Sequence, residues 1–130
     1  MNSQNGADKR KHVLVVDDDL ELTLTYQALL QSHGHRTSTA ANGAEALKLV
    51  MQNHVDAILC DLSMPELAGD LFYREVGHAR PDLQKRFIFL TGHTQNPLYE
   101  SFLSTVKVPV LSKPVLFDHL LAKVEAVLAV

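Results

Sequence analysis

Short apolar runs recur along this chain of 130 residues and alternate with amphipathic stretches. Residues 13–16, 55–60, 86–90 and 108–111 form nearly continuous apolar runs, whereas 35–39 is a more polar stretch of similar length. Runs that are apolar on both faces suit strands buried in a parallel sheet. The run at 13–16 therefore predicts a buried strand, the other three runs predict further strands, and 35–39 is a weaker strand candidate nearer an edge of the sheet.

An amphipathic stretch follows each of these runs and predicts a helix. Helices are expected at 19–33, at about 43–53, at about 70–79, at 97–105 and at the end of the chain. The first of them has four apolar side chains on one face: Leu22, Tyr26, Leu29 and Leu30. The last has an apolar stripe of six: Phe117, Leu120, Leu121, Val124, Val127 and Leu128. These faces are expected to pack on the sheet.

Strand and helix alternate five times in this order, which favours one α/β fold class. Parallel strands joined by right-handed helical crossovers form a doubly wound sheet with helices on both faces. Ligands of such sheets bind at the carboxyl ends of the strands. Residues 1–11 are polar, lack periodicity and are expected to form a flexible tail before a single domain at 12–130.

Composition narrows the function classes further. The net charge of -3 argues against non-specific binding to DNA or to an anionic membrane surface. Cys60 is the only cysteine, so an intramolecular disulfide, a CxxC redox pair and a cysteine-rich zinc site are excluded. No apolar run approaches the roughly 20 residues of a membrane span, and none resembles a signal peptide. We expect a soluble cytoplasmic domain.

Polar side chains follow four of the predicted strands, at the point where each strand ends. They are Asp17 to Asp19, Asp61, Thr91 and Lys113. Because the carboxyl ends of parallel strands meet at one edge of a sheet, these groups are expected to converge.

Carboxylates brought this close repel one another. Two unit charges about 4 Å apart repel by roughly 4 kcal/mol at an effective dielectric constant near 20. A hard divalent cation relieves that repulsion, and Mg²⁺ is usually held by one or two carboxylates together with water. Carboxylate, Mg²⁺, ammonium and hydroxyl groups together favour phosphoryl chemistry in which one carboxylate attacks phosphorus in line.

Four motifs in order carry a family resemblance. The segments 13–19 (VLVVDDD), 61–69 (DLSMPELAG), 90–92 (LTG) and 112–114 (SKP) resemble the receiver domain of two-component response regulators, over roughly residues 12–129. The resemblance implies a flavodoxin-like (βα)5 three-layer sandwich with strand order 2-1-3-4-5. It also implies a signalling phosphoacceptor with limited catalysis of its own phosphorylation and hydrolysis.

The same resemblance assigns roles around a Mg²⁺ ion. Asp18 would bind the metal directly, and Asp17 would hold it mainly through water. Asp61 would contribute a carboxylate oxygen, and Ser63 would contribute its backbone carbonyl. Asp19 lies one residue beyond the family's acidic pair and is expected to cap the first helix.

Further positions would serve the phosphoryl group itself. Asp61 would be the phosphoacceptor, Thr91 would contact the phosphoryl oxygens, and Lys113 would pair first with Asp61 and then with the phosphoryl group. The resemblance implies a cis peptide bond at Pro114 that aims the lysine inward. Gly69 is expected to permit a tight backbone approach where the site loop meets the next helix.

Three positions are expected to affect phosphoryl lifetime and output. In the family, the residues two past the phosphoacceptor and two past the threonine influence hydrolysis, and here these are Ser63 and His93. Many receivers carry an aromatic residue three before the lysine. This chain has Val110 there, so a threonine–aromatic switch is not expected in its usual form.

The expected partner is a sensor histidine kinase or a histidine phosphotransfer domain. Leu20 and Leu24 lie opposite the inward stripe of the first helix and are proposed to contact the donor. Among receivers, the chain most resembles those attached to hybrid histidine kinases. Direct nucleic-acid binding and membrane insertion are not expected, and a weak homodimer is allowed.

Two other functions remain open from the residues alone. In a phosphatase of the haloacid dehalogenase type, Asp17 would be the nucleophile and Asp19 the acid/base. That family usually has threonine or valine two past the second aspartate, where Glu21 stands here. A flavodoxin-like FMN binder would need a hydroxyl- and Gly-rich loop after the first strand, where this chain has three aspartates.

Overall fold

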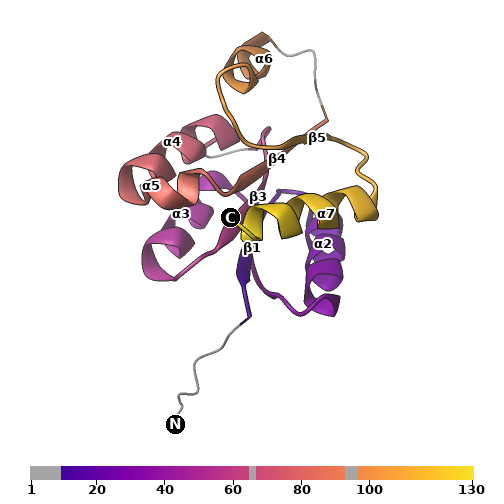
Figure 1. Ribbon diagram of the computed structural model, residues 1–130. Coiled ribbons are helices and arrows are strands. Elements are labelled where there is room, and N and C mark those ends of the chain that lie inside the picture. The colour runs from indigo at the N-terminus through magenta and orange to yellow at the C-terminus, as the bar shows by residue number, and fades with distance from the viewer. Residues whose placement is uncertain (1–9, 65–66, 93–96) are drawn as a thin grey trace.

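The computed structural model describes residues 10–64, 67–92 and 97–130 (Figure 1). Within them lies one parallel five-stranded sheet in the order β2-β1-β3-β4-β5. The strands are β1 (His12–Val16), β2 (Arg36–Ala40), β3 (Ala57–Asp61), β4 (Phe87–Thr91) and β5 (Val110–Ser112). The predicted fold class and strand order are confirmed, and the polar strand β2 is at an edge, as expected.

Helices cover both faces of the sheet and complete a three-layer sandwich. They are α2 (Leu20–Ser32), α3 (Gly43–Gln52), α4 (Gly69–Ala79), α5 (Pro81–Gln84), α6 (Pro97–Leu103) and α7 (Phe117–Leu128). Figure 1 shows α3, α4 and α5 on one side of the sheet and α2 with α7 on the other. None of the described helices has the length and apolar character that crossing a membrane requires.

Side-chain alternation along the strands divides the interior into two apolar cores. Phe87 and Phe89 point from β4 into the core beneath α3, α4 and α6, whereas Ile88 and Leu90 point into the core beneath α2 and α7. β1, β3 and β4 are buried along their whole length. Cys60 is fully buried in the first of these cores, on the opposite face from Asp61, as the alternation predicted.

Several boundaries differ from those predicted. β5 begins at Val110 rather than at residue 108. Pro81 follows the end of α4 but also occupies the first position of the short helix α5, which was not predicted. Proline suits that position because its missing N–H would be unpaired there anyway. In α7 the predicted stripe is buried at Leu120, Val124, Val127 and Leu128 and partly buried at Leu121, whereas Phe117 is exposed.

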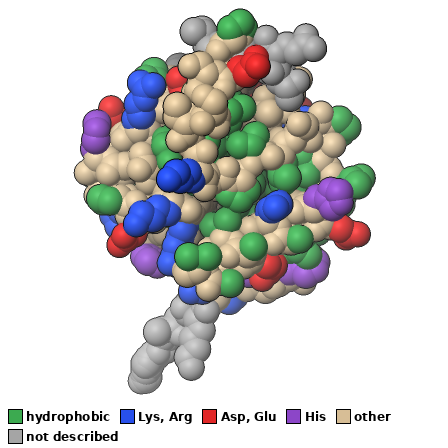
Figure 2. Space-filling view, turned by 45° about the horizontal axis from the view of Figure 1, so that its top comes forward, with side chains coloured by type: hydrophobic (Ala, Val, Ile, Leu, Met, Phe, Trp, Pro, Cys, Tyr) green, Lys and Arg blue, Asp and Glu red, His purple; other side chains and the backbone are tan. Residues whose placement is uncertain are grey.

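Positive and negative side chains are mixed on the surface, in keeping with the small net charge of the chain. On the face in Figure 2, Lys and Arg side chains are interspersed with Asp and Glu side chains. Of the expected tail, 1–11, only residues 10 and 11 are described, and the domain boundary stays a prediction.

Gly69 begins α4 directly beneath the end of β3. Its N–H donates to the carbonyl oxygen of Leu62 at 3.1 Å. A Cβ atom at this position would lie 2.9 Å from both the carbonyl oxygen of Asp61 and the Cα of Leu62. Because both are backbone atoms, they cannot move aside as a flexible side chain would. The close approach that the sequence assigned to Gly69 is therefore present.

Replacing Gly69 by alanine should destabilise the fold by about 1–3 kcal/mol, the usual cost of overpacking. A loss of stability would be informative, because replacing glycine by alanine normally stabilises a helix. Gly92→Ala is the control, since its Cβ would come no closer than 3.9 Å to the Lys113 side chain. Equilibrium urea unfolding measures both, and equal stability of the two variants would contradict this packing argument.

Candidate functional site

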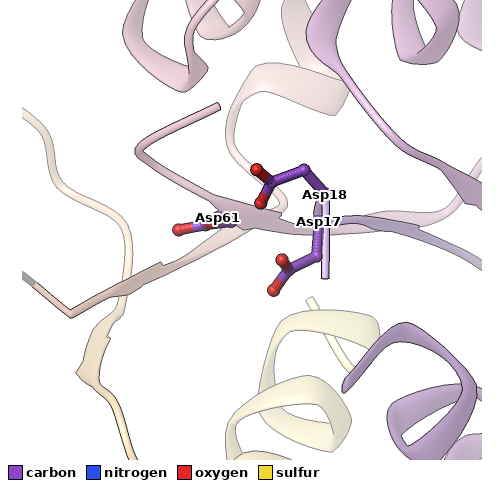
Figure 3. A group of neighbouring side chains, drawn as sticks. All are labelled: Asp17, Asp18 and Asp61. Carbon is purple, nitrogen blue, oxygen red and sulfur yellow. The ribbon is translucent and has the colours of Figure 1, made fainter. Parts of the chain in front are cut away.

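Three carboxylates gather at the carboxyl edge of the sheet, where the neighbouring strands β1 and β3 end (Figure 3). Val16 pairs with Cys60 in the parallel register, so Asp17, which follows β1, lies beside Asp61, the last residue of β3. Asp17, Asp18 and Asp61 each offer an oxygen within 4.8 Å of the others. Asp17 and Asp61 are buried, whereas Asp18 is exposed. The predicted convergence of these groups is present.

Lys113 reaches the same cluster from the end of β5. Its ammonium lies 3.0 Å from Oδ2 of Asp17 and 3.5 Å from Oδ2 of Asp61. The backbone N–H of Lys113 donates to the carbonyl oxygen of Thr91 at 2.8 Å, which continues the pairing of β5 with β4. The peptide bond to Pro114 is cis, as the resemblance implied. The lysine therefore bridges two of the three carboxylates.

Burial and charge shift the ionisation of this group. Burial raises the pKa of Asp61 to about 6, and the charge of Asp17 adds to the rise. The ammonium of Lys113 and the N–H of Ser63, which is 3.4 Å from Oδ1, act in the opposite direction. Burial alone would lower the pKa of Lys113, but its hydrogen bond to Asp17 and the charges of Asp61 and Asp17 raise it. At neutral pH, Asp61 is thus an ionised carboxylate that is poorly solvated.

The loop after β1 is held by hydrogen bonds of its own. Oδ1 of Asp17 accepts the N–H of Asp19 at 2.9 Å, which orients the buried carboxylate. Oδ1 of Asp19 accepts the N–H of Leu22 at 3.2 Å, so Asp19 caps α2 as predicted. This capping bond explains why an aspartate stands at position 19 and directs its side chain toward the N-terminus of α2.

Of the other predicted site residues, Thr91 and Ser63 are described by the structure and His93 is not. Thr91 is buried at the end of β4 and lies in register with Ser112. Ser63 is exposed beside Asp61, and the role of its backbone carbonyl stays a prediction. His93 lies outside the described residues. Its proposed influence on hydrolysis is therefore also left as a prediction.

The donor set fits a hard divalent cation. Carboxylate oxygens are the ligands that Mg²⁺ prefers, and Mg²⁺ commonly retains several waters. Asp18 gives the cluster an exposed side on which such waters have room, while Asp17 and Asp61 form its buried side. These residues are therefore compatible with the predicted magnesium site.

Comparison with known sequences decides the family. The profile of the response regulator receiver domain matches residues 13–125, nearly the whole chain. This chain belongs to the response regulator receiver domain family. The receiver interpretation is thereby confirmed over the phosphatase and flavin-binding alternatives, and the domain is a phosphoacceptor module of two-component signalling.

The receiver domain has relatives of several kinds. It is 32% identical over 117 residues to the transcriptional regulatory protein ZraR of Escherichia coli, which covers 90% of this chain but only 26% of ZraR. Its fold matches a CheY-like receiver domain protein from Methanospirillum hungatei with a TM-score of 0.85 and 24% identity, covering 93% of this chain and 95% of the other.

A second solved structure is relevant to the acidic cluster. It is the receiver domain of a sensor histidine kinase from Pseudomonas aeruginosa, with a magnesium ion coordinated in its active-site cleft. The TM-score is 0.82 at 25% identity, and the match covers 93% of this chain and 99% of that one. The family thus includes a receiver that holds magnesium at its active site.

The raised pKa of Asp61 predicts how stability depends on pH without metal. Since the pKa in the folded protein, about 6, exceeds the unfolded value near 4, the free energy of unfolding falls as pH rises between them. Asp61→Asn should therefore be more stable than the wild type at pH 7–8, by up to about 3 kcal/mol. Near pH 4 the two should converge.

Chemical unfolding in EDTA at pH 4 to 8 measures this difference. Glu75→Gln is the control, because Glu75 is exposed in the middle of α4 and should leave the pH profile unchanged. A constant difference between Asp61→Asn and the wild type over this range would contradict the assignment.

Proposed function

We propose that Asp61 is the phosphoacceptor of this receiver domain and takes its phosphoryl group from a phosphohistidine. The observation that carries the proposal is the position of its carboxylate, within reach of Asp17, Asp18 and the Lys113 ammonium. An ionised, poorly solvated carboxylate is a more competent nucleophile than one surrounded by water. A pKa of about 6 leaves Asp61 ionised at neutral pH.

The proposed transfer is a single displacement at phosphorus. A carboxylate oxygen of Asp61 forms the new P–O bond while the P–N bond to the donor imidazole breaks, and the imidazole leaves with the bonding electron pair. Magnesium held by Asp17, Asp18 and Asp61 would neutralise phosphoryl oxygens. Lys113 lies close enough to Asp61 to exchange its carboxylate partner for the phosphoryl group.

Thr91 supports the same reaction from the end of β4. Its side chain is buried at the edge of the sheet that bears the carboxylates. We assign its hydroxyl the role of donating a hydrogen bond to a phosphoryl oxygen. Phe89 lies two residues before Thr91 on β4 and points into the core beneath α3, α4 and α6. There it packs on Phe102 of α6, with ring centroids 5.5 Å apart. A shift of Thr91 would therefore affect α6 first, without an aromatic residue at Val110.

Leu20 and Leu24 are proposed to contact the phosphoryl donor. They lie one turn apart on α2, directly after the acidic loop formed by residues 17–19, and are 70% and 54% exposed. Exposed leucines at this spacing are unusual on a solvated helix and suit the apolar surface of a partner helix. The partner would be a sensor histidine kinase or a histidine phosphotransfer domain, and this receiver would act in the cytoplasm. Direct contact with nucleic acid is not part of this proposal.

Phosphorylation by a small donor tests the acceptor directly. Incubation with acetyl phosphate and Mg²⁺ should add one phosphoryl group to the wild type and none to Asp61→Asn, as measured by intact mass. The mass gain should disappear in EDTA, because the cation is needed to neutralise the phosphoryl oxygens. A phosphoryl group that persists in Asp61→Asn would refute Asp61 as the acceptor, and attachment at Asp17 would favour the phosphatase chemistry.

Docking is tested separately from chemistry. In Leu20→Ser/Leu24→Ser, transfer from a phosphorylated histidine phosphotransfer domain should slow at least about tenfold, because two apolar contacts are lost. Phosphorylation by acetyl phosphate should not change. Met51→Ser is the matched control, since Met51 is 54% exposed on α3, across the sheet from α2. Unaltered transfer in the double variant would refute this docking surface.

A further inference from the structure

Thr23 is a buried polar residue next to the site to which the sequence analysis gave no role. It lies in the first turns of α2 and is 4% exposed. Its hydroxyl donates to the carbonyl oxygen of Asp19 at 2.9 Å and also lies 3.2 Å from the carbonyl oxygen of Asp17. One side chain thus contacts the backbone on both sides of Asp18.

These contacts matter because Asp18 has little else to hold it. Among the described residues, no hydrogen bond or ion pair reaches the Asp18 carboxylate, which is exposed. The direction of that carboxylate is therefore set by the two peptide groups that flank Asp18. The first bears the carbonyl of Asp17, which meets the Thr23 hydroxyl. The second bears the N–H of Asp19, which donates to Oδ1 of Asp17.

We propose that Thr23 is a positioning residue for magnesium, holding the Asp17–Asp18 peptide so that the Asp18 carboxylate faces Asp61. The inference rests on the proposed function, because it assumes that the three carboxylates bind the metal. Thr23 itself touches neither metal nor phosphoryl group. Its effect passes through the backbone carbonyl of Asp17, in the way that outer hydrogen bonds orient metal ligands elsewhere.

The same helix supplies a matched control in Thr25. Its hydroxyl donates to the carbonyl oxygen of Glu21 at 2.9 Å, four residues back, as that of Thr23 does to Asp19. Thr25 is exposed and, within the described part of the chain, its side chain makes no hydrogen bond to residues 17–19. Loss of either hydroxyl removes one such intrahelical bond, and such bonds contribute little to helix stability. Only the loss at Thr23 also frees the Asp17 carbonyl.

The test is the affinity of the full chain for Mg²⁺, measured by isothermal titration calorimetry without any phosphoryl donor. Thr23→Val keeps the shape of the side chain and should weaken binding about tenfold or more, the usual effect of removing an outer hydrogen bond. Thr25→Val should bind as the wild type does. Thr23→Ser retains the hydroxyl and should restore most of the affinity.

Unfolding of the metal-free variants separates positioning from folding. Both Thr23→Val and Thr25→Val should remain cooperatively folded in EDTA. Thr23→Val should be the less stable of the two, because it leaves the buried Asp17 carbonyl without its hydrogen bond, and it alone should lose Mg²⁺ affinity. Equal affinity of Thr23→Val and Thr25→Val would overturn the inference, as would Thr23→Ser binding as weakly as Thr23→Val. If the wild type itself fails to bind Mg²⁺, the proposed magnesium site is what fails.

Discussion

Crowding of like charge at one edge of the sheet is the constraint on which the rest of this receiver domain depends. Asp17 and Asp61 are buried beside each other, and the nearby charge of Asp17 opposes ionisation of Asp61. Lys113 makes the arrangement tolerable because its ammonium reaches both carboxylates. Burial first, and then the charge of Asp17, still raise the pKa of Asp61, so Lys113 compensates only in part. The folded chain therefore holds a carboxylate that is charged but not fully stabilised.

Maintaining that arrangement requires a rigid frame, and the strand order supplies it. The two carboxylate-bearing strands, β1 and β3, are neighbours at the interior of the sheet and are covered by helices on both faces. Side chains packed this densely resist displacement. Lys113 comes instead from the edge strand β5, only three residues long, and its long side chain spans the distance to the acids.

The sequence predicted what depends on strong local patterns. Apolar runs located β1, β3 and β4, and the order of elements then placed Asp17, Asp61 and Lys113 together. Weaker patterns failed for identifiable reasons. Pro81 ends one helix and starts another, and only the first effect was expected. Thr23 escaped notice because the inward face of α2 was identified from apolar residues, whereas its burial depends on hydrogen bonds to the backbone.

Asp17 and Asp18 are adjacent in sequence but electrostatically different. Both oxygens of the Asp17 carboxylate are engaged, one by the N–H of Asp19 and the other by Lys113. Asp18 is exposed, so its carboxylate is open to solvent. The three carboxylates together exceed Lys113 by two negative charges, which a divalent cation balances. In the proposed magnesium site, Asp17 would thus hold the lysine as well as the metal, whereas Asp18 would serve the metal alone, so neither carboxylate could replace the other.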